Sequence, residues 1–300
     1  MNRGLLYALI CYGAWGVLPI YWKALSDVPA PEILAYRVLW TWLALSLVLA
    51  LRHRWSWLRE VLSSGLTLAT FLATSGLLFL NWLTYIWAVN AGFIVETSLG
   101  YFINPLVNVL LGRLFLGEQL RPGQRAAVGL ALGGVLYLTW SYGRLPWIAL
   151  TLAFTFAFYG LLRKTAPLDA LEGLSLEMGL GLLPALAYLA LLFQQGQAAS
   201  ADAGMGTWIL LVGLGLITGV PLVSFSAAAR RLTLTTLGLM QYMAPTLQFL
   251  IGVFLYREPF GPSQLVGFTL IWIALALYTG ESLHHHRRPG PAAKGLVGSD

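Results

Sequence analysis

Charged residues are scarce in this chain. Asp, Glu, Lys and Arg together make up 10% of the 300 residues, whereas 58% of the residues are hydrophobic. About a quarter of the residues of a soluble globular domain are charged, so this composition excludes a soluble protein. The hydrophobic residues also form long runs, and a transmembrane helix needs roughly 20 mostly apolar residues in succession.

Residues that bind metals or carry catalytic chemistry are also rare. Cys11 is the one cysteine, which excludes an intrachain disulfide and a cysteine metal site. The four histidines and four aspartates lie outside the apolar runs, which excludes histidine metal sites, Ser-His dyads and paired aspartates within the membrane. No lysine follows the Gly-x-x-x-x-Gly pattern of a phosphate loop. The sequence therefore predicts no catalytic residue, no metal, no cofactor and no ATP-driven transport, and it predicts that the chain is not an enzyme.

Charged and polar segments divide the apolar residues into ten runs. The sequence thus predicts an all-α integral membrane protein with ten transmembrane helices. We place these helices at Gly4–Trp22, Glu32–Leu51, Leu66–Val89, Thr97–Leu116, Gly123–Trp140, Leu145–Leu162, Gly173–Phe193, Thr207–Ala228, Leu237–Tyr256 and Pro262–Glu281.

Lysines and arginines alternate along the chain in a way that predicts its orientation. Fourteen of the 18 lie near the N-terminus, in every second connecting segment, or in the C-terminal tail. The opposite segments contain only Lys23, Arg144 and Arg257. Because basic residues concentrate in cytoplasmic segments, we expect a multi-pass protein of the cell inner membrane with both termini in the cytoplasm. The net charge of +6 then needs no nucleic-acid partner.

The sequence repeats itself at an offset of 140 residues, where Thr97–Asn108 lies over Leu237–Gln248. Identical residues also meet at this offset, among them Pro105 with Pro245, Pro122 with Pro262, and Glu118 with Glu258. Each unit contains five helices, an odd number, so the second copy enters the membrane inverted. We expect two inverted five-helix repeats at 4–141 and 142–281, followed by a disordered polar tail at 282–300. Such repeats are typical of secondary transporters.

Polar residues form matching stripes on the fourth and ninth predicted helices. Pro105 and Pro245 each remove a helical hydrogen bond, so we expect helix breaks whose carbonyls need another partner. We interpret the stripes, with aromatic residues of other helices, as the lining of a central cavity; packing between helices is the alternative. The predicted substrate-binding residues are Trp15, Arg37, Asn81, Tyr85, Tyr101, Asn104, Asn108, Tyr159, Gln241, Tyr242 and Gln248.

Ionisable residues near the predicted helices receive separate interpretations. Arg37 is the one basic residue well inside a predicted span, so it marks a substrate or proton pathway, or it reaches the interface with its long side chain. Glu177, its mate in the repeat, is interpreted as a carboxylate near a helix start, favoured by the helix dipole. We interpret Glu96, Glu118 and Glu258 as helix-end caps and ion pairs that contribute little to the stability of the fold.

Several strings of residues resemble the RarD group of EamA-type permeases, in the drug/metabolite transporter superfamily. They are Gly100–Asn108 (GYFINPLVN), Asn81-Trp82, Ile86–Asn90 (IWAVN), Phe156–Gly160 (FAFYG), Pro29–Leu34 (PAPEIL) followed by Arg37, and Pro245–Leu247. The resemblance covers nearly the whole chain before the tail. It implies ten helices in two repeats and export of amino acids or other small metabolites through a central cavity. Members are often labelled chloramphenicol-sensitive proteins.

The sequence and the resemblance together predict a secondary active transporter that exports small organic metabolites or drugs by alternating access. The expected partners are the lipid bilayer and a small-molecule substrate, such as an amino acid, an amphenicol or another metabolite; proton coupling is a further hypothesis. Two alternatives stay open. One is a membrane enzyme acting on lipid or isoprenoid substrates, and the other is a membrane receptor or subunit that does not transport.

Overall fold

The computed structural model describes residues 3–52, 57–117, 119, 121–229, 231–232 and 240–287. Within these residues the chain is helical and forms no strand. The helices are α1 (Arg3–Lys23), α2 (Ala30–Leu51), α3 (Trp57–Ser63), α4 (Gly65–Asn90), α5 (Ile94–Leu116), α6 (Pro122–Tyr142), α7 (Trp147–Thr165), α8 (Ala170–Gln194), α9 (Met205–Ala229), α11 (Met243–Leu250), its π-helical continuation η1 (Ile251–Leu255), and α12 (Pro262–Arg287).

Each of the ten predicted runs contains a helix, and the differences lie at the ends. The short helix α3 was not expected. Residues 237–239 of the ninth predicted helix lie outside the described residues, as do residues 288–300 of the predicted tail. Helix α12 continues past Glu281 to Arg287, into the segment assigned to the tail. No glycine or proline interrupts this stretch, so nothing in its sequence ends the helix there.

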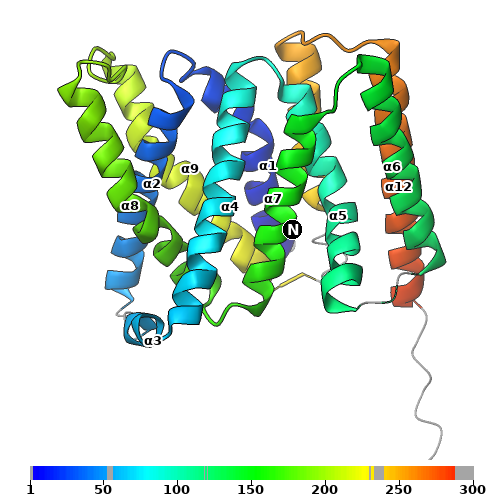
Figure 1. The fold of residues 1–300 in the computed structure, drawn as a ribbon, viewed down its shortest axis with the longest axis horizontal. Coiled ribbons are helices and arrows are strands. Elements are labelled where there is room, and N and C mark those ends of the chain that lie inside the picture. The colour runs from blue at the N-terminus through cyan, green and yellow to red at the C-terminus, as the bar shows by residue number, and fades with distance from the viewer. Residues whose placement is uncertain are drawn as a thin grey trace, which may run out of the picture.

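The helices lie side by side in one bundle, and the turns between them fall at two ends (Figure 1). We call one the Glu258 end; it holds the turns that join α1 to α2, α4 to α5, α6 to α7, α8 to α9, and η1 to α12. We call the other the Arg163 end; it holds α3, the last turn of α5, the first turn of α6, and the turn that joins α7 to α8. Consecutive long helices therefore run in opposite directions.

Length and apolar composition make seven of the described helices able to cross a membrane. The spans are Arg3–Lys23, Ala30–Leu51, Gly65–Asn90, Ile94–Phe115, Leu171–Gln194, Met205–Phe225 and Pro262–Glu281, and two shorter apolar helices are Trp147–Arg163 and Met243–Leu255. Large apolar side chains also face outward, with Leu66 81% and Leu216 69% exposed. Because such a surface is unfavourable in water and suited to hydrocarbon, the chain is a multi-pass membrane protein.

Four apolar clusters fill the interior among the described residues, and two of them are large. The first large cluster packs α1, α2, α4, α8 and α9 around buried residues such as Trp22, Ile33 and Ile86. The second packs α5, α6, α7 and α12 around residues such as Phe102 and Leu138. The residues discussed below lie in and beside these two clusters.

Gly215 allows α9 to lie close against α2. A Cβ atom at this position would stand 2.6 Å from the backbone carbonyl oxygen of Trp40. We expect Gly215→Ala to push the two helices apart and lower the free energy of unfolding by about 1–3 kcal/mol. Thermal unfolding of the purified protein measures this effect.

The matched control is Gly219→Ala, one turn further along α9, where nothing lies within 4 Å of the added carbon. Alanine favours a helix over glycine by about 1 kcal/mol, so this control is expected to unfold at the same or a higher temperature. Equal unfolding temperatures for the two variants would contradict the close contact between α2 and α9 at Gly215.

Candidate functional site

Arg37 lies in α2 with 6% of its surface exposed, and it is buried between helices rather than directed to the bundle end. Its guanidinium carbon lies 3.6 Å from the ring centre of Trp82 on α4 and 5.2 Å from that of Trp22 on α1. Its Nε donates a hydrogen bond of 3.1 Å to the hydroxyl of Thr218 on α9. Three helices thus hold the cation by its flat faces and by one edge.

No carboxylate neutralises Arg37 among the described residues, where the recorded ion pairs are Arg144 with Glu96 and Arg163 with Glu177. The phenol groups of Tyr85 and Tyr101 lie near enough to act on its charge. Their rings meet edge to face at 5.6 Å, and the buried hydroxyl of Tyr85 has no hydrogen-bond partner. A buried cation without an anion is costly, so the arrangement suits an anionic group from outside the protein.

Together Arg37, Trp82, Tyr85, Tyr101 and Thr218 form what we call the Arg37 site. Three of the five, Arg37, Tyr85 and Tyr101, were predicted from the sequence. Trp82 and Thr218 were not among the predicted residues. Their partner role depends on how α4 and α9 meet α2, which no local pattern in the sequence reveals.

The predicted asparagines lie in contacts between helices. Asn81 donates its amide to the Leu152 carbonyl at 3.0 Å and to the Thr155 hydroxyl at 2.9 Å, both on α7. Asn104 donates to the Ala153 carbonyl at 3.1 Å, and its oxygen accepts from Asn108 at 3.0 Å. These bonds match the packing alternative, since each amide joins α4 or α5 to α7 or to its own helix.

The two prolines behave differently. Pro105 lies inside α5, which runs without interruption from Ile94 to Leu116, so the expected helix break there is wrong. The lost hydrogen bond is tolerated within one continuous helix, as it often is where neighbouring helices pack around the proline. Pro245 stands in the first turn of α11, directly after a turn at Tyr242, so the chain is interrupted beside it.

The other predicted residues lie apart from the Arg37 site. Gln248 donates to the backbone carbonyl of Trp15 at 3.1 Å, which joins α11 to α1. Trp15 packs its ring against Phe225 with the ring centres 6.0 Å apart. Gln241 and Tyr242 are half-buried where the chain turns into α11. Tyr159 lies in another polar cluster, at the Arg163 end.

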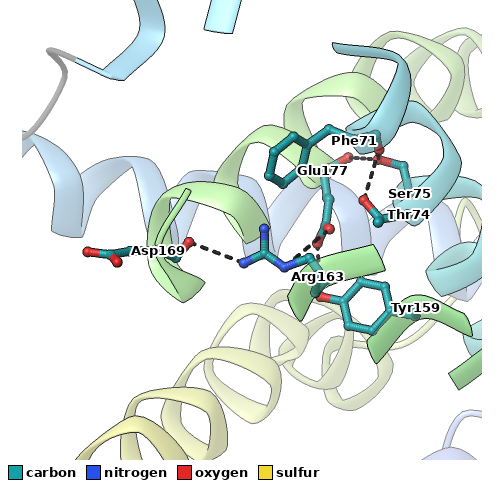
Figure 2. A network of polar contacts seen from close by, with 7 residues as sticks. All are labelled: Phe71, Thr74, Ser75, Tyr159, Arg163, Asp169 and Glu177. Atoms are coloured by element: carbon teal, nitrogen blue, oxygen red, sulfur yellow. Dashed lines mark hydrogen bonds and ion pairs between the residues drawn. The ribbon is translucent and has the colours of Figure 1, made fainter. Parts of the chain in front are cut away.

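That second cluster surrounds Glu177, which sequence reasoning placed near a helix start (Figure 2). The structure corrects this interpretation, because Glu177 lies in the third turn of α8 and its side chain is fully buried. Its Oε1 lies 3.9 Å from the Nε of Arg163, and its Oε2 accepts a hydrogen bond of 3.1 Å from the hydroxyl of Tyr159. No local signal in the sequence reveals this cluster, because it depends on how α7 and α8 meet at the Arg163 end.

Carboxylates at the Glu258 end cap helices other than their own. Glu258 accepts from the backbone N–H groups of Ile94 at 2.7 Å and Val95 at 2.8 Å, at the start of α5. Glu96 accepts from the N–H of Ile148 at 3.1 Å, at the start of α7. The interpretation of Glu258 and Glu96 as helix caps is therefore confirmed, and the helices that they cap are distant from them in the sequence. Glu118 lies outside the described residues.

Glu32 also accepts two backbone hydrogen bonds, from the N–H groups of Ala199 and Ser200 in the turn between α8 and α9, each at 3.0 Å. Burial raises the pKa of Glu258 above the usual value of a glutamate, and the hydrogen bonds from Val95 and Ile94 oppose that shift. All three carboxylates tie segments that are distant in the sequence.

Glu258→Ala is expected to leave both N–H groups at the start of α5 without their acceptor. Loss of a helix cap costs about 0.5–2 kcal/mol, so we expect a fall of that size in the free energy of unfolding. Thermal unfolding measures it, with Asp202→Ala as the control because Asp202 is an exposed carboxylate at the same end. Equal unfolding temperatures for the two variants would contradict the cap.

Two of the cavities among the described residues lie away from the Arg37 site. One, of about 270 Å³, opens at the Glu258 end beside Glu96, Arg144 and Glu258. The other, of about 360 Å³, is an apolar groove between α2, α4 and α8. None of the predicted substrate-binding residues lines either cavity. Among the described residues, no group of three histidine, cysteine or acidic side chains could hold a metal ion.

Comparison with known proteins identifies the family. The model of the EamA-like transporter family matches residues 2–140 and again residues 145–280. Protein RarD of Streptomyces exfoliatus is 46% identical over 96% of this chain and 91% of its own length. An uncharacterized transporter of Bacillus subtilis, YojE, is 45% identical over 93% of this chain and 94% of its own.

A crystal structure of a protein 20% identical in sequence covers 94% of this chain and 99% of its own, with a TM-score of 0.58. That likeness concerns the fold alone. The sequence relatives and the double family match carry the assignment: this multi-pass membrane protein belongs to the EamA-like transporter family.

Proposed function

We propose that this chain is a secondary active transporter that exports small organic molecules across the inner membrane by alternating access. The family and the names of its relatives indicate a transporter rather than an enzyme. No ATP-binding loop is present in the sequence, so an ion or substrate gradient is the expected energy source.

The proposed architecture is two inverted halves of five membrane helices each. Its support is the double family match, because residues 2–140 cover α1, α2, α4, α5 and most of α6, and residues 145–280 cover α7, α8, α9, α11–η1 and most of α12. An odd number of crossings reverses the direction of the second half. The distribution of basic residues favours a cytoplasmic location for the Arg163 end and for both termini.

The Arg37 site carries the substrate proposal. It combines a buried cation, a phenol hydroxyl without a hydrogen-bond partner among the described residues, and the faces of Trp82 and Tyr101. An anionic group on the substrate would pair with the guanidinium, and a flat apolar part would lie against the rings. Because Arg37 is 6% and Tyr85 2% exposed, the site is expected to open only when helices move, as alternating access requires.

Flux of labelled compounds into liposomes containing the purified chain tests the proposal. The panel pairs amino acids with their uncharged amides and includes amphenicols and other small metabolites. We expect saturable flux of compounds that carry a carboxylate and weaker flux of the matching amides. Saturable binding without flux would favour a receptor or subunit, and chemical conversion of a compound would favour an enzyme; either result would overturn the proposal.

A further inference from the structure

The buried carboxylates of this chain are satisfied to different degrees. Glu32 and Glu258 each accept two backbone N–H groups at 2.7–3.0 Å. Glu177 is more deeply buried than Glu258, but its carboxylate has no backbone N–H partner among the described residues: it meets the hydroxyls of Tyr159 and Thr74 and forms a long ion pair with Arg163. Its Oε1 and the Nη1 of Arg163 are both buried without a hydrogen-bond partner. The fold therefore stabilises the charged carboxylate of Glu177 less than it stabilises the carboxylates of Glu32 and Glu258.

Glu177 also stands within the apolar span Leu171–Gln194, where ionisable residues are costly and mark ion or substrate pathways. The titratable groups that face it are Tyr159 and Arg163, both on α7. From α4 it meets the hydroxyl of Thr74, and within the described residues α2, the other helix packed on α8, shows no charged group beside it. The charged partner of Glu177 is Arg163, which also donates to the backbone carbonyl of Asp169.

The surroundings of Arg163 allow its guanidinium to move away from the Glu177 carboxylate. Its side chain is 13% exposed at the end of α7, its Nη2 donates to the Asp169 carbonyl at 3.1 Å, and its guanidinium lies 5.1 Å from the ring centre of Phe71 (Figure 2). Gly173 leaves the space that the guanidinium occupies, since a Cβ there would lie 1.8 Å from Nη1. The cation can therefore move between the carboxylate and the water at the Arg163 end.

We propose that Glu177 is the proton-binding site of this transporter, an inference that rests on the proposed transport function. A proton from water at the Arg163 end bonds to a carboxylate oxygen of Glu177 and makes it neutral. Arg163 keeps its positive charge and turns toward water and the Asp169 carbonyl. On release the proton returns to water and the ion pair forms again, so charge and atoms balance over one cycle.

The contacts of α7 with its neighbouring helices indicate how protonation of Glu177 would affect helix movement. Asn81 and Asn104 fasten α7 to α4 and α5 through the Leu152 and Ala153 carbonyls. Polar ties between α7 and α8 include those of Tyr159 and Arg163 to the Glu177 carboxylate, and α4 adds a hydrogen bond of 3.4 Å from the Ser75 hydroxyl to the Glu177 backbone carbonyl. Protonation of Glu177 thus weakens the connection of α8 to the unit of α4, α5 and α7, and this links proton binding to the opening of the bundle.

Infrared difference spectroscopy during a pH titration of the purified full chain in lipid tests the site with the proton itself as ligand. We expect a protonated carboxyl band, titrating between about pH 4 and about pH 9, that is present in the wild type and lost in Glu177→Gln. Glu258→Gln is the matched control and keeps that band. A band unchanged in Glu177→Gln, or absent from the wild type, would overturn the proposal.

A second variant tests the pair without altering either charged residue. Gly173→Ala displaces the Arg163 guanidinium, and losing a cation at this range is expected to move the midpoint of the band up by about one pH unit or more. Gly160→Ala on α7 meets nothing within 4 Å and should leave the midpoint in place. Equal midpoints in the two variants would contradict the role of Arg163, even if Glu177→Gln fails to fold.

The two proposals fail separately. The carboxyl band reports proton binding whether or not any compound is transported. Flux that is saturable but insensitive to a pH gradient in the wild type, together with no titrating band, would remove the proton site and leave transport standing. A titrating band with no flux of any compound would leave the proton site and remove the transport function.

Discussion

Arg37→Gln is expected to reduce transport about 30-fold or more. Removing one partner of a buried charge pair costs about 2–5 kcal/mol, and each 1.4 kcal/mol is a factor of ten. Lysine keeps the charge but not the flat guanidinium that lies on Trp82 or the Nε bond to Thr218. We therefore expect Arg37→Lys to retain an intermediate activity. Initial rates of flux in liposomes, at matched protein content, give the comparison.

Stability separates a binding role for Arg37 from a structural one. If Arg37 awaits an anion from the substrate, the empty protein contains an uncompensated buried cation, and replacing it with glutamine should not lower the unfolding temperature. If Arg37 only holds α2, α4 and α9 together, Arg37→Gln should unfold earlier and lose transport for that reason. Arg144→Gln is the control, because Arg144 is 57% exposed at the Glu258 end. A destabilised Arg37→Gln, or one that transports normally, would contradict the Arg37 site.

The membrane helices could be predicted because each needs a long apolar run, and such a run is visible without knowledge of its neighbours. The ends of the helices were harder to predict, because a helix continues until a residue that cannot extend it. Helix α12 shows this, because it continues to Arg287 although the apolar residues end earlier. The continuous α5 makes the same point, since Pro105 removes one hydrogen bond without ending the helix.

Partners of side chains could be predicted less well. Arg37 stood out because a cation inside an apolar run is unusual in any fold. Asn81 and Asn104 looked similar to cavity residues, yet what decides their role is the position of the α7 carbonyls, which only the packed bundle fixes. Glu177 was given a reasonable local interpretation, as a carboxylate near a helix start. Its pairing with Arg163 required the register of α7 against α8, and the sequence pattern does not contain that register.

Locking the Glu258 end by a disulfide is expected to stop transport. At this end α5 meets η1, where a Cβ on Gly252 would lie 3.2 Å from the Cβ of Ile94. Disulfides join Cβ atoms about 3.5–4.5 Å apart, so Ile94→Cys with Gly252→Cys needs only a small adjustment. The background is Cys11→Ala, which removes the one native cysteine. Oxidation should abolish flux in proportion to the cross-linked fraction, and a reductant should restore it.

The reason is that the two segments come from different proposed halves and are joined at the proposed outer end. Alternating access requires this contact to break once per cycle, together with the hydrogen bonds from Ile94 and Val95 to Glu258. A covalent bond prevents the separation without adding charge or bulk at the Arg37 site. The binding site stays intact while its exit is closed, so substrate binding by the oxidised protein should persist when flux is lost.

A matched pair separates this effect from damage by oxidation. Gly134 and Leu270 join α6 to α12, and a Cβ on Gly134 would also lie 3.2 Å from the Cβ of Leu270. These helices pack along each other away from the Arg37 site, so the same oxidation of Gly134→Cys with Leu270→Cys should leave flux largely unchanged (Figure 1). Full flux through the protein cross-linked between residues 94 and 252 would mean that the Glu258 end does not open there. Substrate would then have to leave by another route.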